Sequence, residues 1–163
     1  PAIIALGNLY RDGDAVAYDP ALALQYYGKA IKLGSIDALW QLGGLYEDKL
    51  NKIDSAIYWY KQAADKNYHW AMSSLGRIHF VKKEFQQALQ WFNKGADLKN
   101  SSCMYFKAMI YENGYGVPVD MIAAKSWYRS AAALGHNLAN KRLKELDANE
   151  NPPRNQNTDW DEY

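Results

Sequence analysis

Three histidines and one cysteine are the residues best suited to metal binding or nucleophilic chemistry in this chain of 163 residues. Zinc sites use such ligands at short, regular spacings such as CxxC or HxxxH. His69, His79, His136 and Cys103 are scattered and show no such spacing. The sequence therefore predicts no metal site. A single cysteine also excludes an intramolecular disulfide.

Two glycine-containing segments begin like ligand loops but lack the rest of the motif. Asp12, Gly13 and Asp14 start like a calcium loop, yet the alternating oxygen ligands and the closing glutamate are missing. Gly114, Tyr115 and Gly116 lack the further glycines and the preceding strand of a dinucleotide site. No phosphate-binding GxxxxGK motif occurs either. The sequence therefore predicts no cofactor.

The remaining polar residues form no recognisable catalytic group. No Ser, His and Asp occur at a spacing that indicates nucleophilic catalysis, and scattered carboxylates are expected on a solvated helix face. A net charge of +1 gives no bulk attraction for nucleic acid or an anionic membrane. No run of 18 apolar residues is present to span a bilayer. We therefore expect a protein without catalytic residues, nucleic-acid binding or membrane insertion.

The elements that position these side chains follow an internal repeat. The pattern small-x-x-x-Leu-Gly-x-x-Tyr occurs twice, followed by a third copy, a degenerate fourth and the beginning of a fifth. The copies start at Ala2, Ala38, Ala71, Cys103 and Ala139, which are 36, 33, 32 and 36 residues apart. Self-similarity at such a period is typical of helical repeat proteins. His79 takes the tyrosine position of the third copy, and Cys103 takes the small-residue position of the fourth. We therefore expect both side chains to pack between helices.

A second element follows each first one and completes a helix pair. It carries two aromatic residues and then a small one, as in Tyr26, Tyr27 and Ala30; Trp59, Tyr60 and Ala63; Trp91, Phe92 and Gly95; and Trp127, Tyr128 and Ala131. Small residues recur on the first helices at Gly7, Gly43, Gly76 and Ala108. Large side chains are therefore predicted to fill the space beside small ones, so that the helix backbones approach closely.

The helix boundaries agree with this phase. Between the units lie Gly34, Asn67, Asn100 and Gly135, residue types that tolerate the left-handed conformation at a helix end. Second helices are predicted to start at Asp19, Asp54 and Asp120, whose side chains can accept a free backbone N–H. Asn100, Ser101 and Ser102 also match a glycosylation sequon, which doubles as a helix start.

Taken together, residues 2 to about 146 resemble a Sel1-like, tetratricopeptide-type repeat protein. The long loops Arg11–Asp19 and Glu112–Asp120 are similar to the Sel1-like signature, and the middle units have tetratricopeptide length. The resemblance implies an all-α, right-handed superhelix of four helix-turn-helix repeats and a capping helix. The predicted solenoid covers residues 1–147, with repeats at about 2–34, 36–67, 69–100 and 102–135, a capping helix at 137–147 and a polar tail at 148–163.

In this family the first helices line the concave face, which implies a set of partner-binding residues. The inward positions are Ile4, Asn8, Arg11, Asp12, Trp40, Glu47, Asp48, Ser73, Arg77, Phe80, Val81, Tyr105, Glu112 and Asn113, with Trp70 at the groove edge. Trp40, Phe80 and Tyr105 are aromatic residues that the repeat pattern itself does not require. Aromatic and arginine side chains are typical interface anchors, although these could instead pack against neighbouring first helices.

The resemblance implies a protein that binds another protein or peptide, as an adaptor, scaffold or regulator. It also implies a bacterial source, in the periplasm or cytoplasm, and includes a subtype that inhibits a bacterial effector as an immunity protein. One alternative is a cell-wall-related enzyme or ligand-binding protein. Another is self-association, in which Asp159–Tyr163 would dock on Trp40 and Arg77 of a second copy.

Overall fold

The computed structural model describes residues 2–13 and 15–150, and over these residues every regular element is helical. The elements are α1 (Ala2–Asp12), α2 (Pro20–Lys32), α3 (Ile36–Gly44), the π-helical turn η1 (Leu45–Lys49), α4 (Ile53–Ala64), α5 (His69–Val81), α6 (Phe85–Asp97), α7 (Ser101–Asn113), α8 (Met121–Ala133) and α9 (Asn137–Glu150).

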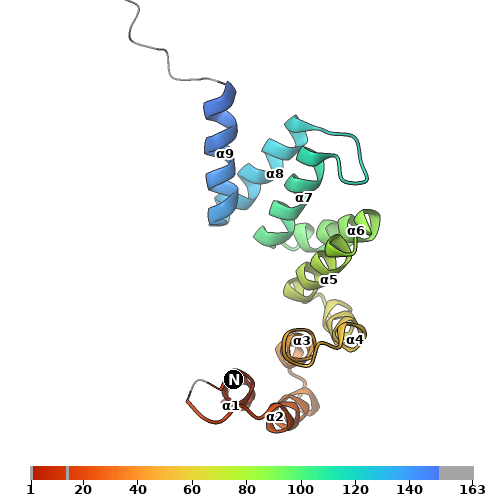
Figure 1. Cartoon of the computed structure of the whole chain (residues 1–163), viewed down its shortest axis with the longest axis vertical. Helices are drawn as coiled ribbons and strands as arrows, with labels where there is room; N and C mark the ends of the chain where they lie inside the picture. The colour runs from red at the N-terminus through yellow and green to blue at the C-terminus, as the bar shows by residue number, and fades with distance from the viewer. Residues whose placement is uncertain (1, 14, 151–163) are drawn as a thin grey trace, which may run out of the picture.

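The helices form a right-handed superhelix, as the resemblance to Sel1-like repeat proteins implies. Each helix packs mainly on its neighbours in the sequence, so that α1 and α2, α3 and α4, α5 and α6, and α7 and α8 form successive pairs. Figure 1 shows the pairs following an arc, with α1, α3 and α5 on its inner side and α1 and α9 at its two ends. The first helices of these pairs therefore border the hollow of the arc.

Glycines let the large aromatic residues of the second helices pack directly against the first helices. A Cβ atom added to Gly7 would lie 2.5 Å from the ring of Tyr27, and one added to Gly43 would lie 2.5 Å from the ring of Tyr60. Gly76 lies against Phe92 in the same way. The predicted packing of large against small residues is confirmed in these three pairs.

The fourth repeat has Lys107 where the other first helices carry the signature leucine. The Lys107 side chain is nevertheless buried, and its ammonium group lies 3.6 Å from the centre of the Trp127 ring. Burial lowers the pKa of Lys107, and the aromatic face offsets part of the cost of burying the charge. The aliphatic stem thus takes the place of leucine in the core.

Two of the three predicted aspartate caps are confirmed. Asp19 accepts hydrogen bonds from the backbone N–H groups of Ala21 and Leu22 at the start of α2, and Asp120 caps α8 at Ala123. The prediction for Asp54 is wrong, because α4 begins one residue earlier, after Lys52, without a side-chain cap. Asp54 lies within the first turn, where a carboxylate still interacts favourably with the helix dipole.

The predicted helix ends are confirmed at Gly34, Asn67 and Gly135, whose φ angles are 83°, 59° and 82°. The prediction for Asn100 is wrong, because the left-handed residue there is Lys99, with a φ of 59°. Asn100 instead accepts a hydrogen bond from the N–H of Cys103 and is only 2% exposed. The sequon therefore lies in a helix cap that is closed to modification in the folded chain.

The π-helical turn η1 was not predicted, and it accommodates one extra residue in the second repeat. Eighteen residues separate Leu42 from Tyr60, whereas seventeen separate Leu75 from Phe92. A π-helical turn absorbs such an insertion without interrupting the helix, and these turns are frequent at functional sites. The chain leaves η1 through Asn51, which has a φ of 50°.

The last helix is longer than the sequence pattern predicted. α9 continues to Glu150, three residues past the predicted end at Asp147, so the predicted tail begins inside the helix. No proline lies between the start of α9 at Asn137 and Pro152 to stop the helix earlier. The remainder of the predicted tail, including the proposed docking segment Asp159–Tyr163, lies outside the described residues.

Candidate binding groove on the concave face

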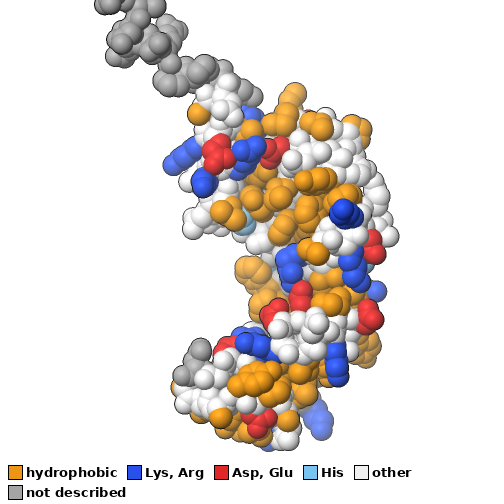
Figure 2. Space-filling view, in the orientation of Figure 1, with side chains coloured by type: hydrophobic (Ala, Val, Ile, Leu, Met, Phe, Trp, Pro, Cys, Tyr) orange, Lys and Arg blue, Asp and Glu red, His pale blue; other side chains and the backbone are white. Residues whose placement is uncertain are grey.

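The first three repeats form a polar groove on the inner side of the arc, with a volume of about 640 Å³. Figure 2 shows this side of the molecule as a hollow between its lower and upper parts. The groove is lined by Arg11, Asp12, Trp40, Gln41, Gly44, Glu47, Asp48, Lys49, Tyr60, Ser74 and Arg77. It therefore brings together six of the predicted residues, namely Arg11, Asp12, Trp40, Glu47, Asp48 and Arg77.

Glu47 joins three helical elements at the floor of this groove. Its carboxylate accepts a hydrogen bond from the hydroxyl of Tyr60 on α4 (2.9 Å) and one from the guanidinium of Arg77 on α5 (2.5 Å). Burial, together with this carboxylate, raises the pKa of Tyr60, so the phenol stays protonated and donates. The position of Arg77 in the groove is thus fixed by η1.

Arg11 makes the corresponding link between α1 and α3. Its guanidinium donates to both carboxylate oxygens of Asp12, at 2.7 and 2.9 Å, and to Oε1 of Gln41 at 2.7 Å. The hydrogen bonds from Arg11 lower the pKa of Asp12, so this carboxylate is ionised at neutral pH. The near wall of the groove therefore carries an arranged pair of opposite charges.

The side chains most available to a partner are those of Asp48, Lys49 and Arg77, all of which are exposed. Asp48 and Lys49 follow Glu47 on η1, so the π-helical turn presents both charges at the groove. The groove thus combines fixed charges at its floor with exposed charges of both signs along its side.

Trp40 lines the other wall of the groove and Trp70 packs beside it, but the two differ in exposure. The indole N–H of Trp40 donates to Ser74 (3.0 Å), and its ring lies 6.1 Å from that of Tyr68 and 6.5 Å from that of Trp70. Trp40 is partly buried between α3 and α5, whereas Trp70 is 45% exposed. Trp70, at the start of α5, therefore offers the more accessible aromatic surface.

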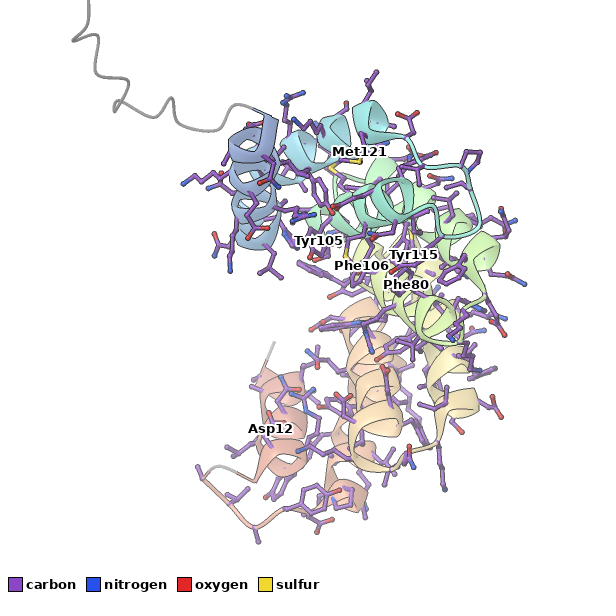
Figure 3. The ribbon with its side chains drawn as sticks, turned by 45° about the horizontal axis from the view of Figure 1, so that its top comes forward. Asp12, Phe80, Tyr105, Phe106, Tyr115 and Met121 are labelled. Carbon is purple, nitrogen blue, oxygen red and sulfur yellow. The ribbon has the colours of Figure 1, made fainter. Side chains whose placement is uncertain are left out.

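Phe80 and Tyr105 do not line the groove. Phe80 packs within 5.4–5.9 Å of the rings of Phe85, Phe106 and Tyr115, and Figure 3 shows this aromatic cluster well away from Asp12 on α1. Tyr105 stacks on His136, with the ring centroids 4.6 Å apart. Both residues therefore pack against neighbouring repeats, which is the alternative that the sequence left open. Their rings connect the third repeat to the fourth, and the fourth to the turn before α9.

Glu112 repeats the geometry of Glu47 at the far end of the arc. It accepts hydrogen bonds from the Tyr128 hydroxyl (2.6 Å) and from the Arg142 guanidinium (2.9 Å from Nε). Burial raises the pKa of Glu112, but the hydrogen bonds from Arg142 and Tyr128 outweigh it and lower the pKa overall. Glu112 therefore anchors α8 and α9 rather than lining the groove.

The other predicted residues contribute to packing or lie outside the groove. Asn8 accepts a hydrogen bond from the Tyr27 hydroxyl (2.7 Å), and Ile4 packs on the core around Tyr27. Ser73 is half-buried, Val81 is exposed near Arg77, and Asn113 donates to the carbonyl of Met109.

Gln41, Lys49, Tyr60 and Ser74 line the groove but were not among the predicted residues. A signal for two of them is present in the repeats. The residue nine places after the start of each copy faces the residue three places after the start of the next copy. The former are Arg11, Glu47, Phe80 and Glu112, and the latter are Gln41, Ser74, Phe106 and Arg142. At three of the four repeat junctions these two residues contact each other directly. At the remaining junction Glu47 contacts Arg77 instead, because the short Ser74 side chain binds Trp40. Comparing these two positions would have identified Gln41 and Ser74.

The histidines and the cysteine take packing positions. Cys103 is fully buried, and burial raises its pKa to about 12, so the thiol remains protonated. Nδ1 of the half-buried His79 lies 2.6 Å from a carboxylate oxygen of Glu84 at the end of α5. In the part of the chain that the structure describes, no three His, Cys, Asp or Glu residues gather to hold a metal ion.

Within that same part, no helix has the length and apolar character needed to cross a membrane.

Sequence comparison identifies the repeat type. A family profile described as "Sel1 repeat" matches residues 1–35, 36–68, 71–100 and 101–136. The chain is also 30% identical over 156 residues to chitin synthase regulatory factor 3 of Schizosaccharomyces pombe. That match covers 88% of this chain but only 17% of the fungal protein, so the chain spans about a sixth of its relative.

Solved structures show the same architecture. A Sel1 repeat protein from Oxalobacter formigenes superposes with a TM-score of 0.80 at 26% identity, covering 91% of this chain and 64% of that one. The immunity protein Pa5087 of Pseudomonas aeruginosa superposes with a TM-score of 0.55 at 19% identity, covering 83% and 69% of the two chains. At 19% identity the second similarity concerns the fold alone.

Proposed function

Because the chain belongs to the Sel1 repeat family, we propose that it is a non-catalytic module that binds another protein along the polar groove of its concave face. The observation that carries this proposal is the geometry of Glu47, which fixes Arg77 and Tyr60 at the groove floor. Side chains held in place before binding lose little conformational entropy when a partner arrives. The groove is therefore suited to recognition by a preformed surface.

The exposed side chains around this floor have the character of an interface. Trp70 offers an accessible aromatic surface, and Arg77 is an arginine whose orientation is already set. Aromatic and arginine residues supply much of the binding energy in protein interfaces, and extended concave surfaces are what solenoids use for binding. Asp48 and Lys49 add charges of both signs, which favours a partner with a matching charge pattern.

A regulatory role is our preferred form of this activity. The fungal relative is named a regulatory factor, and it contains a region similar to most of this chain. Regulation by a binding module needs no catalytic group of its own, only a partner whose activity changes on binding. The immunity subtype has the support of a shared fold alone, and we expect it to show as a tight complex with one cognate protein.

A pull-down from the native source, with quantification of each retained protein, tests the groove. The groove variant combines Asp48→Asn, Lys49→Gln and Trp70→Ala, which change exposed side chains and leave the contact between Glu47 and Arg77 intact. A matched control combines Asp65→Asn, Tyr58→Ala and Arg129→Gln, which are exposed on or beside second helices. Trp40 and Tyr105 stay unchanged because both pack between repeats, so their loss would disturb the fold.

We expect one partner to be retained by the wild type and the control and to be lost from the groove variant. Thermal melting must first show that both variants unfold close to the wild-type temperature. Retention of the same partner by all three chains would show that the groove is not the binding surface.

A further inference from the structure

Equivalent leucines of the first three repeats differ sharply in exposure. Leu42 and Leu75, the signature leucines of α3 and α5, are 5% and 0% exposed, whereas Leu6 of α1 is 41% exposed. The first positions of the copies show the same contrast. Ala2 is exposed, while its equivalents Ala38, Ala71, Cys103 and Ala139 are all fully buried. One face of α1 is thus open where the same face of the later first helices is covered.

The second helix of the preceding repeat provides this cover. Leu42 belongs to a core cluster with Ala23 and Tyr27 of α2, and Leu75 belongs to one with Tyr60 and Ala63 of α4. Gly95 of α6 shows how close this approach is, because a Cβ atom there would lie 3.1 Å from Cβ of Cys103 on α7. The aromatic residue therefore covers the leucine, and the small residue lets the next first helix begin beside it.

No element among residues 2–13 and 15–150 takes that place beside Leu6. The open surface extends to Leu33, which is 75% exposed, and to an apolar depression of about 450 Å³ lined by Ala2, Ile3, Ile4, Ala30, Leu33, Gly34 and Ser35. Figure 2 shows hydrophobic side chains on this lower part of the molecule, formed by α1 and α2. The opposite end differs, because α9 exposes charged residues such as Lys141, Lys144 and Glu145.

We infer that the open face of α1 is a docking surface for an amphipathic helix of the second-helix type, with an aromatic residue placed over Leu6 and a small residue placed beside Ala2. The inference continues an interface that the chain already forms between α2 and α3, α4 and α5, and α6 and α7. Covering Leu6 and Leu33 would remove exposed apolar surface from water, which favours docking. This surface shares no lining residue with the polar groove, so a helix docked here would leave the groove accessible.

A fusion tests the inference on the whole chain. A copy of residues 53–69, which contains α4 and the following turn, is placed directly before Pro1, so that Pro1 takes the position that Trp70 holds after the native copy. A matched control fusion carries Tyr60→Ser and Ala63→Glu in the added copy alone. The measurements are the thermal unfolding midpoint and amide hydrogen exchange across α1.

The intact fusion should unfold at a higher temperature than the chain alone, and exchange at Leu6 and its neighbours should slow by about tenfold or more. The control fusion should leave both quantities unchanged. Equal behaviour of the two fusions would overturn the inference. If either fusion fails to fold, a synthetic peptide of residues 53–69 is titrated onto the chain, and NMR shifts confined to α1 and α2 are the supporting result. Absence of these shifts overturns the inference.

The molecular mass of the unfused chain tests whether a second copy of the chain, rather than the proposed helix, covers this face. A dimer in sedimentation equilibrium that Leu6→Glu and Leu33→Glu convert to a monomer would show that another copy covers this face, which would overturn the proposed helix. A monomer that these substitutions leave folded is the expected result, because both leucines are exposed.

Discussion

The carboxylate of Glu47 holds the guanidinium of Arg77, which lies thirty residues further along the chain in the next first helix. The tyrosine hydroxyl of the intervening second helix completes the contact. Glu112 binds Arg142 across the same number of residues and accepts from Tyr128 in the same way. Each carboxylate thus ties three successive elements together, and this arrangement leads to the first prediction.

We expect Glu47→Gln to destabilise the chain by about 1–3 kcal/mol, because two donors lose a charged acceptor in a nearly buried site. Urea unfolding followed by far-ultraviolet circular dichroism measures the change. Asp48→Asn on the same turn is the control and should stay within about 0.5 kcal/mol of the wild type, since Asp48 is exposed. Equal stability of the two variants would contradict the role assigned to Glu47.

A second prediction concerns the contact between glycine and tyrosine. Gly43→Ala should cost about 1–3 kcal/mol, because the new methyl group would lie 2.5 Å from the Tyr60 ring and force it to move. Gly28→Ala in α2 is the matched control, since a Cβ atom there meets no neighbour. The control should stabilise the chain by up to about 1 kcal/mol, because alanine is the better helix former. Thermal unfolding of both variants should therefore give shifts of opposite sign.

Lys99 is the one left-handed residue at a repeat boundary that is neither glycine nor asparagine. Lys99→Gly should stabilise the chain by about 0.5–1 kcal/mol, since glycine adopts a φ of 59° without the strain of a side chain. Gly135→Ala tests the converse and should destabilise by a similar amount, because Gly135 has a φ of 82°. Chemical denaturation gives both values, and a loss of stability in Lys99→Gly would refute the argument.

The pH dependence of stability tests the Glu112 contact. The pKa of Glu112 is lowered in the folded chain from an ordinary value of 4.5, so the unfolded chain binds more protons between the two values. The stability that ionised Glu112 adds to the folded chain is therefore fully present above pH 4.5, and it is lost as the pH falls through the pKa of the folded state. Melting temperatures between pH 6 and pH 3 should fall more steeply for the wild type than for Glu112→Gln. Parallel curves would show that ionisation of Glu112 does not stabilise the folded chain.

The repeat architecture could be predicted because small and large residues recur at fixed positions of each repeat. Glycine opposite an aromatic residue recurs at one phase, and only closely packed helices require that combination. The caps at Asp19 and Asp120 are local hydrogen bonds, and local sequence is sufficient to predict them. Asn100 was misassigned because asparagine suits both a left-handed end and a helix cap, and the repeat spacing favours Lys99 for the former.

The groove could be predicted only in part. Its inward positions were implied by the resemblance to the repeat family, which placed Arg11 and Arg77 on the inner side, and both line the groove. The family rule does not specify what a side chain at such a position contacts, so Phe80 and Tyr105 were assigned to the groove although neighbouring rings hold them. The hydroxyl of Tyr60 reaches the groove floor from a second helix, and no first-helix rule could have identified it.

The extra residue in η1 also bears on how such a surface can change over time. One residue turns an α-helix by about 100°, so an insertion at Leu45–Lys49 re-aims the residues within it while the core residues on either side keep their places. Length variation at a single site can thus alter the charges offered to a partner without rebuilding the scaffold. Descendants of one repeat array can acquire different partners by insertion or deletion as readily as by substitution.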